Sequence, residues 1–167
     1  SLEKAQDFAN KYGFQKAYDN LDEMFADPDT DTLYIASPNT LHYPQAKKAL
    51  QAGKNVILEK PFVSTVEEAK DLFETAEANH VMIFEAITNI HTPNFGLLKD
   101  QLDRAGNIKL ANLNYSQYSS RYDKYRQGIV ENAFDPNMEG GALADINVYT
   151  LHLAVGLFGK PKRITYY

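Results

Sequence analysis

The most informative part of this sequence is the stretch Asn55-Val56-Ile57-Leu58-Glu59-Lys60-Pro61-Phe62. Its first half, residues 56–58, is a short apolar run typical of a strand buried in a sheet that is covered on both faces. A carboxylate, an ammonium group and a proline follow at the point where the strand should end. In an open α/β sheet, ligands bind beyond the carboxyl ends of the strands, which predicts that Lys60 faces a pocket. The alternative is an exposed Glu59–Lys60 pair that leads into a turn, because so short a motif has little specificity.

Predicted strands and helices alternate on both sides of this stretch. Periodicity predicts strands over residues 16–18, 32–36, 56–58 and 81–84, and helices over residues 2–12, 21–25, 44–52 and 64–79. Ser64 is predicted to cap the last of these helices, with Glu67 completing a capping box. The order strand, helix, strand predicts parallel strands joined by crossover helices.

The pattern changes near residues 87–93. A helix predicted over residues 95–105 is followed by residues 108–118, a long alternating stretch with one polar face, which is typical of an antiparallel sheet. The remaining predictions are a loop, a helix and a strand over residues 119–138, 140–158 and 163–167. We therefore predict an α/β fold, in which a partial parallel sheet precedes part of an α+β domain with an open, largely antiparallel sheet. The predicted domains are residues 1–88 and 89–167.

Composition limits the classes of function. The 167 residues suffice for one sizeable core, or for one domain and part of another. A net charge of −5 argues against nucleic acid or an anionic membrane as partner, and no apolar run is long enough to cross a bilayer. The sequence has no Cys, and its four His residues lack metal-ligand spacing, so we predict no metal site. These features fit a cytoplasmic protein.

Two predicted strand ends carry polar groups that a parallel sheet would bring to the same crevice. Ser37-Pro38-Asn39 follows one strand, with His42 three residues later, and Glu59-Lys60-Pro61 follows the next. Ser and Asn are also ordinary turn formers, so a purely structural role remains the alternative. Further candidates for a substrate pocket are Thr88, Asn89 and Arg121.

The final predicted helix carries a polar stripe. At 100° per residue, Asp145, Tyr149 and His152 fall within about 60° of one another on an otherwise apolar helix, which predicts that the stripe is buried or lines a cavity. One interpretation is a proton-transfer group, Tyr149 or His152, oriented by Asp145. A lysine ammonium close to a tyrosine hydroxyl favours the phenolate that a general base needs. The alternative is a hydrogen-bonded pair that only stabilises the core.

In combination, these segments resemble the glucose-fructose oxidoreductase / inositol dehydrogenase / MocA family of nicotinamide-dependent oxidoreductases. The segments that carry the resemblance are residues 37–42 (SPNTLH), 49–61 (ALQAGKNVILEKP) and 140–149 (GGALADINVY). The likeness extends over essentially the whole chain in the right order. It implies a partial Rossmann-type domain that binds NAD or NADP, and a C-terminal domain that has a large open sheet and binds a small-molecule substrate. The alternating face of residues 108–118 would allow this sheet to form a homo-oligomer, which we predict.

The resemblance also assigns roles to residues. It implies that Lys60 lies beside the nicotinamide and the substrate hydroxyl, that Tyr149 and Asp145 complete the catalytic group, and that His152 is a substrate contact. Residues implied to line the cofactor are Ser37, Pro38, Asn39, His42, Glu59, Lys60 and Pro61. Many relatives have His at the position of Tyr149, which makes this chain more similar to the dihydrodiol and aldose dehydrogenase branch than to an inositol dehydrogenase.

The family pattern includes a glycine-rich turn that this sequence lacks, since no Gly-x-Gly-x-x-Gly occurs in it. We therefore expect a fragment without the N-terminal glycine-rich turn and the C-terminal strands. Our hypothesis is that these 167 residues alone bind cofactor weakly or not at all and are inactive. The implied activity is hydride transfer between NAD(P) and a hydroxyl-bearing carbon of a sugar, polyol or dihydrodiol. The alternatives are a non-catalytic paralogue that binds a ligand, and a protein whose sheet mainly builds oligomers.

Overall fold

The computed structural model describes residues 1–165. Within them, three parallel strands form one sheet: β1 (Thr32–Ile35), β2 (Asn55–Leu58) and β3 (Ile83–Glu85). The strands lie in the order β1-β2-β3, with Leu33 opposite Val56 and Val56 opposite Ile83. The predicted parallel sheet is therefore confirmed, with strand boundaries within two residues of those expected.

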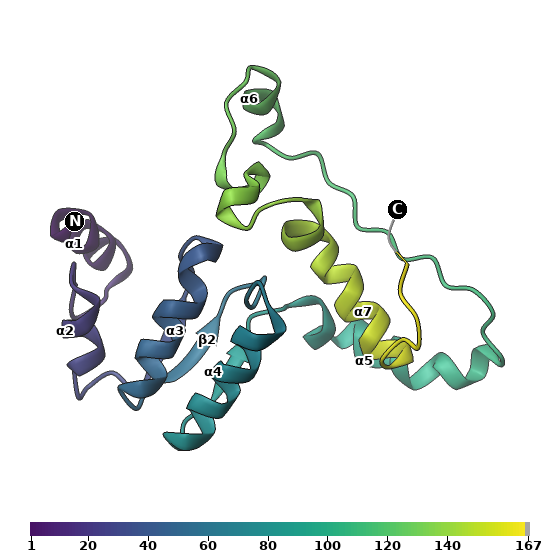
Figure 1. The fold of residues 1–167 in the computed structure, drawn as a ribbon, viewed down its shortest axis with the longest axis horizontal. Helices are drawn as coiled ribbons and strands as arrows, with labels where there is room; N and C mark the ends of the chain where they lie inside the picture. The colour runs from purple at the N-terminus through teal and green to yellow at the C-terminus, as the bar shows by residue number, and fades with distance from the viewer. Residues whose placement is uncertain (166–167) are drawn as a thin grey trace.

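Two crossover helices cover one face of this sheet. Helix α3 (His42–Gln51) connects β1 to β2, α4 (Val66–Ala78) connects β2 to β3, and the two pack side by side (Figure 1). Alternate strand residues point toward these helices and form the core with them. Its buried side chains include Leu33, Ile35, Leu50, Val56, Leu58 and Leu72.

The predicted capping box is one residue early. Thr65, rather than Ser64, accepts a hydrogen bond from the backbone N–H of Glu68, and the Glu68 carboxylate accepts one from the N–H of Thr65. Both residue pairs have the required spacing of three, so local spacing alone did not decide between them.

The other face of the sheet has no cover in the described part of the chain. Tyr34 on β1 and Phe84 on β3 are 60% and 56% exposed on this face, whereas their strand neighbours Leu33 and Ile83 are buried. The predicted burial of both faces is therefore wrong for residues 1–165. The side chains of a strand alternate between faces, so helices on one side bury only every second residue.

The segment before the sheet contains α1 (Leu2–Tyr12) and α2 (Leu21–Ala26). Gly13 ends α1 with a φ of 76°, a left-handed conformation that glycine adopts without strain. The strand predicted over residues 16–18 does not form. These residues lie between two helices, and the Lys16 side chain reaches the loop that follows α2.

The segment after the sheet contains α5 (Pro93–Gln101), α6 (Tyr122–Arg126) and α7 (Val148–Phe158). The helix predicted over residues 95–105 is α5 followed by a 3₁₀ turn, Leu102–Ala105. None of the helices in residues 1–165 is long and apolar enough to span a bilayer.

The predicted antiparallel sheet does not form within residues 1–165. Residues 108–118 run as an unpaired trace along the outside of the molecule between α5 and α6 (Figure 1), and Leu110 is 87% exposed. A strand needs a neighbour to pair its backbone N–H and C=O groups, and no described segment lies beside this one in a ladder. Residues 163–165 likewise form no strand, and the rest of that predicted strand, residues 166–167, lies outside the described residues.

The predicted final helix starts later and is less buried than expected. Its first part is a π-helical turn, Leu143–Asn147, which continues into α7. Leu143, Leu151 and Val155 are about half exposed, so the prediction of burial on most sides is wrong.

Candidate active site

The carboxyl ends of the three strands meet at one edge of the sheet, as their parallel order requires. Ser37 lies just after β1, Glu59 and Lys60 follow β2, and Glu85 is the last residue of β3. The two strand ends selected from the sequence are therefore neighbours. Glu85 was not among the predicted site residues, although the strand-end rule that selected Lys60 also identifies it when applied to the third strand.

Lys60 reaches from this edge to the segment that begins the last helix. Its Nζ donates hydrogen bonds of 2.7 Å to both the carbonyl oxygen and Oδ1 of Asp145. The side chains of Lys60 and Asp145 are 17% and 32% exposed, so the ion pair is only partly shielded from water. Asp145 belongs to the π-helical turn, a feature that often occurs at functional sites.

Tyr149 lies beside this pair. Lys60 Nζ is 5.5 Å from the centre of the Tyr149 ring, within the range of a cation–π contact. The ring stacks on Tyr115 with 5.0 Å between centroids, and Asn89 Nδ2 donates a 2.7 Å hydrogen bond to the Tyr149 carbonyl. Among residues 1–165 the Tyr149 hydroxyl makes no hydrogen bond. The structure thus brings Lys60, Asp145 and Tyr149 together and leaves that hydroxyl available to a ligand.

His42 lies beneath the strand-end turns. It is 1% exposed, its Nδ1 is 2.9 Å from the carbonyl oxygen of Pro61, and its Nε2 is 3.0 Å from that of Ser37. The peptide bond between Lys60 and Pro61 is cis. We interpret His42 as a brace that joins the two turns, in place of the predicted cofactor contact, because a side chain this buried offers almost no surface to a ligand.

Glu59 is held at the same edge by two donors. Its carboxylate accepts hydrogen bonds from the Tyr34 hydroxyl and, at 3.1 Å, from the backbone N–H of Lys60. The bond to this carboxylate raises the pKa of Tyr34 above its usual value, and partial burial adds to the shift. The Glu59 side chain is therefore fixed beside the backbone that carries Lys60.

His152 is paired within the protein. Its Nε2 lies 2.9 Å from Oε2 of Glu85, whose Oε1 accepts a 3.1 Å hydrogen bond from the backbone N–H of Phe62. The predicted substrate contact is thus engaged with a carboxylate of β3. This pair attaches α7 to the sheet edge one turn beyond Tyr149.

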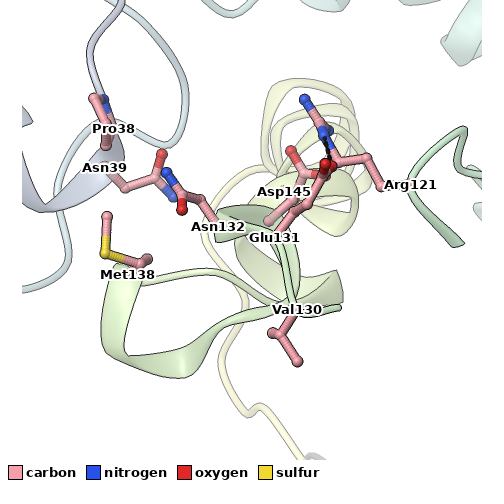
Figure 2. A pocket seen from close by; sticks show the side chains of 9 residues that line it. Pro38, Asn39, Arg121, Val130, Glu131, Asn132, Met138 and Asp145 are labelled. Carbon is pink, nitrogen blue, oxygen red and sulfur yellow. Dashed lines mark ion pairs between the residues drawn. The ribbon is translucent and has the colours of Figure 1, made fainter. Parts of the chain in front are cut away.

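A cavity of about 550 Å³ lies beside Asp145 (Figure 2). Its lining includes Pro38, Asn39, Arg121, Glu131, Asn132 and Asp145. A second cavity of about 530 Å³ shares Arg121 and Asp145 with it and continues toward Tyr115. Of the other predicted substrate contacts, Thr88 is exposed and lines neither cavity.

Two buried side-chain oxygens have no hydrogen-bond partner among the described residues. They are Ser37 Oγ and Asn89 Oδ1. Buried polar atoms are normally hydrogen-bonded, so Ser37 Oγ fits a polar ligand group seated at the end of β1. No cluster of three or more His, Asp or Glu side chains that could hold a metal ion occurs in residues 1–165.

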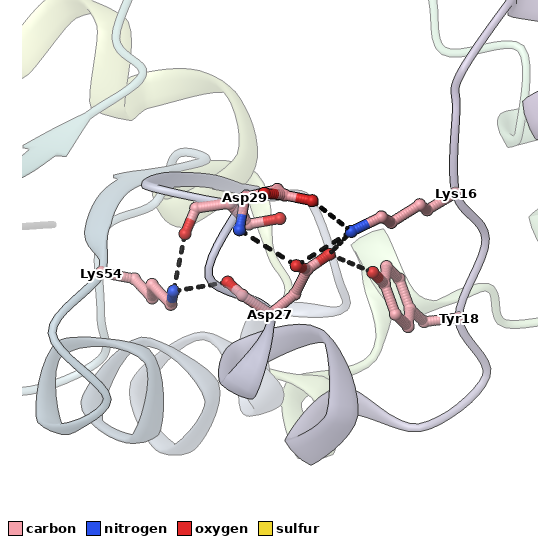
Figure 3. A network of polar contacts seen from close by, with 6 residues as sticks. Lys16, Tyr18, Asp27, Asp29 and Lys54 are labelled. Carbon is pink, nitrogen blue, oxygen red and sulfur yellow. Dashed lines mark hydrogen bonds and ion pairs between the residues drawn. The ribbon is translucent and has the colours of Figure 1, made fainter.

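A second polar cluster lies at the opposite, amino end of the sheet (Figure 3). Asp27 accepts hydrogen bonds from Lys16 Nζ, the Tyr18 hydroxyl and the backbone N–H of Asp29, which together hold the pKa of Asp27 well below its usual range. The same contact with Asp27 raises the pKa of Lys16. The buried Lys54 donates a 2.8 Å hydrogen bond to the Asp27 carbonyl. These groups satisfy one another, which is the mark of a structural cluster.

Comparisons with known proteins identify the family and support the fold. Residues 1–87 match a family described as "Oxidoreductase family, NAD-binding Rossmann fold". The chain is 44% identical over 164 residues to scyllo-inositol 2-dehydrogenase (NADP(+)) IolU of Bacillus subtilis (strain 168), covering 98% of this chain and 50% of that protein. It is 29% identical over 168 residues to trans-1,2-dihydrobenzene-1,2-diol dehydrogenase of Mus musculus, covering 98% of this chain and 48% of that protein. A crystal structure of an NAD-binding oxidoreductase from Klebsiella pneumoniae superposes with a TM-score of 0.74 at 29% identity, covering 95% of this chain and 42% of the other.

Two consequences follow from these matches. The chain spans about half the length of the curated relatives it matches. The sequence argument against an inositol dehydrogenase, which rested on Tyr149, gains no support, because one of these relatives carries that name at 44% identity.

Proposed function

Because this chain belongs to the oxidoreductase family with an NAD-binding Rossmann fold, to which residues 1–87 match, we propose that the protein transfers a hydride between NAD(P) and a hydroxyl-bearing carbon. The proposed substrate is a sugar, polyol or dihydrodiol. The activities for which the two relatives are named, on scyllo-inositol and on a dihydrodiol, support this class.

The observation that carries the proposal is the convergence of Lys60, Asp145 and Tyr149 at the strand ends. We propose that Lys60 donates a hydrogen bond to the substrate oxygen. We further propose that Tyr149 exchanges a proton with the same substrate oxygen, since the Tyr149 hydroxyl makes no hydrogen bond within residues 1–165. Asp145 would act on Lys60 rather than on Tyr149, because its carboxylate lies 2.7 Å from Lys60 Nζ. In the direction of oxidation, the carbon would give up its hydride to oxidised NAD(P), and the hydroxyl proton would pass to the Tyr149 oxygen, which accepts it only in the phenolate form.

The strand-end residues would hold the nicotinamide end of the cofactor. The residues proposed for this contact are Ser37, Pro38, Asn39, Glu59 and Pro61. The unpartnered hydroxyl of Ser37 supports this fit. When bound, NAD(P) supplies the hydride acceptor or donor, and the protein supplies position and electrostatics.

A lysine substitution in the full protein tests this proposal. We expect Lys60→Met to lower kcat/KM by about 10²–10⁴-fold, the usual contribution of a positioned proton-transfer or charge-stabilising group. Lys70→Met is the matched control, because Lys70 lies exposed on α4 and should leave activity unchanged. Far-UV circular dichroism establishes that both variants fold. Full activity in a folded Lys60→Met protein would refute the assignment.

We further propose the division into a cofactor-binding part, residues 1–88, and a substrate-binding part, residues 89–167. A homo-oligomer through the C-terminal sheet and a cytoplasmic location both stay predictions. Sedimentation of the full protein tests the first: a monomer at micromolar concentration would contradict it. Fractionation of the source cells tests the second.

A further inference from the structure

Much of the wall of the 550 Å³ cavity beside Asp145 comes from the loop of residues 130–140, which folds back onto the sheet edge. The Asn39 amide donates a 2.9 Å hydrogen bond to the carbonyl of Glu139, which ties the loop to the end of β1. A Cβ on Gly140 would lie 2.3 Å from the carbonyl oxygen of Asn132, so only glycine allows this close approach. The close approach of Gly140 to Asn132 therefore holds Glu131 and Asn132 at the cavity.

Arg121 is the one cation among the described residues that line this cavity. Its guanidinium donates no hydrogen bond within residues 1–165, and its charged contact is an ion pair of 3.3 Å from Nε to Oε2 of Glu131. The terminal nitrogens are thus available to a ligand. An unopposed arginine in such a wall would favour carboxylate or phosphate, with which it forms two parallel hydrogen bonds.

Glu131 opposes that preference. Its carboxylate lines the same cavity and is less than one-third exposed. It is also held from outside by Lys124 Nζ at 2.5 Å, a residue that does not line the cavity. Figure 2 shows the Arg121–Glu131 pair adjacent to Asp145, which is itself paired with Lys60. Neither Lys60 nor Lys124 belongs to the cavity lining, so an anionic group bound to Arg121 would face two carboxylates in the wall itself. A neutral hydroxyl compound meets no such repulsion, because Arg121 can donate to one hydroxyl oxygen while Glu131 accepts from a neighbouring hydroxyl.

We propose that Glu131, paired with Arg121, is a specificity-determining residue that selects neutral, vicinal-diol substrates over their carboxylate- or phosphate-bearing analogues. This inference rests on the proposed function and adds to it the charge class of the substrate. Specificity of this kind comes as much from repelling the wrong ligand as from binding the right one.

The test measures kcat/KM of the full protein with NAD and with NADP on two panels. The neutral panel is scyllo-inositol, D-xylose and D-glucose, and the anionic panel is D-glucuronate, D-xylonate and D-glucose 6-phosphate. We expect the best neutral compound to exceed the best anionic one. We expect Glu131→Gln to raise the anionic-to-neutral ratio by about 10- to 100-fold, as removal of one close like charge allows. The matched control is Asp123→Asn, which makes the same change in net charge at a nearby exposed residue bonded to Tyr118, outside the cavity lining, and should leave the ratio unchanged.

The outcomes separate the two proposals. Turnover with an anionic preference in the parent, or a ratio that Glu131→Gln does not change, overturns the specificity proposal alone. Absence of turnover on both panels counts against the proposed function, and the specificity proposal falls with it. If Glu131→Gln does not fold, Arg121→Gln replaces it, and this variant should lower the anionic-to-neutral ratio at least tenfold, because it removes the one cation of the cavity lining while the Glu131 carboxylate stays, paired only with Lys124 outside the lining.

Discussion

The contact between Lys60 and Asp145 makes a quantitative prediction, because the lysine bonds to two different atoms of the same residue. Nζ donates to the carbonyl oxygen and to Oδ1, each at 2.7 Å. A hydrogen bond to a charged group contributes about 1.5–3 kcal/mol, and the partial exposure of both side chains favours the lower end. We therefore expect Lys60→Met to cost about 3 kcal/mol and Asp145→Ala about 1.5 kcal/mol of unfolding free energy.

A double-mutant cycle on the full protein separates the two bonds. The cycle compares the parent, Lys60→Met, Asp145→Ala and the double variant by urea unfolding, followed by far-UV circular dichroism. The coupling energy reports the carboxylate bond, at about 1.5 kcal/mol, and Lys60→Met should still cost about 1.5 kcal/mol in the Asp145→Ala background, because the carbonyl bond remains there to be lost. A coupling energy of zero would refute the carboxylate contact. A residual cost of zero would refute the carbonyl contact.

Three further predictions concern stability and use urea midpoints or melting temperatures. Leu58→Ala should cost about 2–5 kcal/mol, because Leu58 is fully buried between the sheet and its two helices. Thr65→Ala should cost about 1 kcal/mol through loss of the helix cap, whereas Ser64→Ala should be nearly neutral; the opposite order would restore the cap predicted from sequence. Asp27 contributes stability that is present above its usual pKa, near 4, and lost as the pH falls toward its lowered folded pKa, so Asp27→Asn should flatten the acid limb of a plot of melting temperature against pH. An acid limb of unchanged slope in this variant would contradict the role given to the bonds from Lys16 and Tyr18.

The parallel sheet was predictable because its determinants are local. Each strand is a mostly apolar run of four residues or fewer, and each crossover helix has a clear periodicity of its own. Gly13 likewise marks the end of α1 without reference to any other element. The strand-end rule then selected Lys60 and the Ser37 turn without any knowledge of the tertiary fold. The same rule would have found Glu85, had it been applied to the third strand.

Other features depended on partners that a local pattern does not contain. Residues 108–118 alternate as a strand should, but alternation describes the two faces and not the edges, and the described residues supply no edge partner. Glu131 and Asn132 reach the cavity only because the backbone closes tightly at Gly140, which no periodicity signals. His42 was predicted to line the cofactor, but its position beneath the two turns follows from three-dimensional packing that the sequence pattern does not contain.

The polar stripe on the last helix was predicted from a constant angle of about 100° per residue, which the structure does not keep along the whole stripe. Asp145 lies in a π-helical turn and Tyr149 in α7, so the constant 100° step that grouped them does not hold across their junction. Their common position at Lys60 is instead set from outside the helix: Lys60 after β2 holds Asp145, and Glu85 at the end of β3 holds His152. Tyr149 lies between these two anchors, and Asn89 bonds to its carbonyl. The placement of the proposed proton-transfer group therefore follows from the order of the strands, because two neighbouring strand ends fix both ends of the segment that carries it.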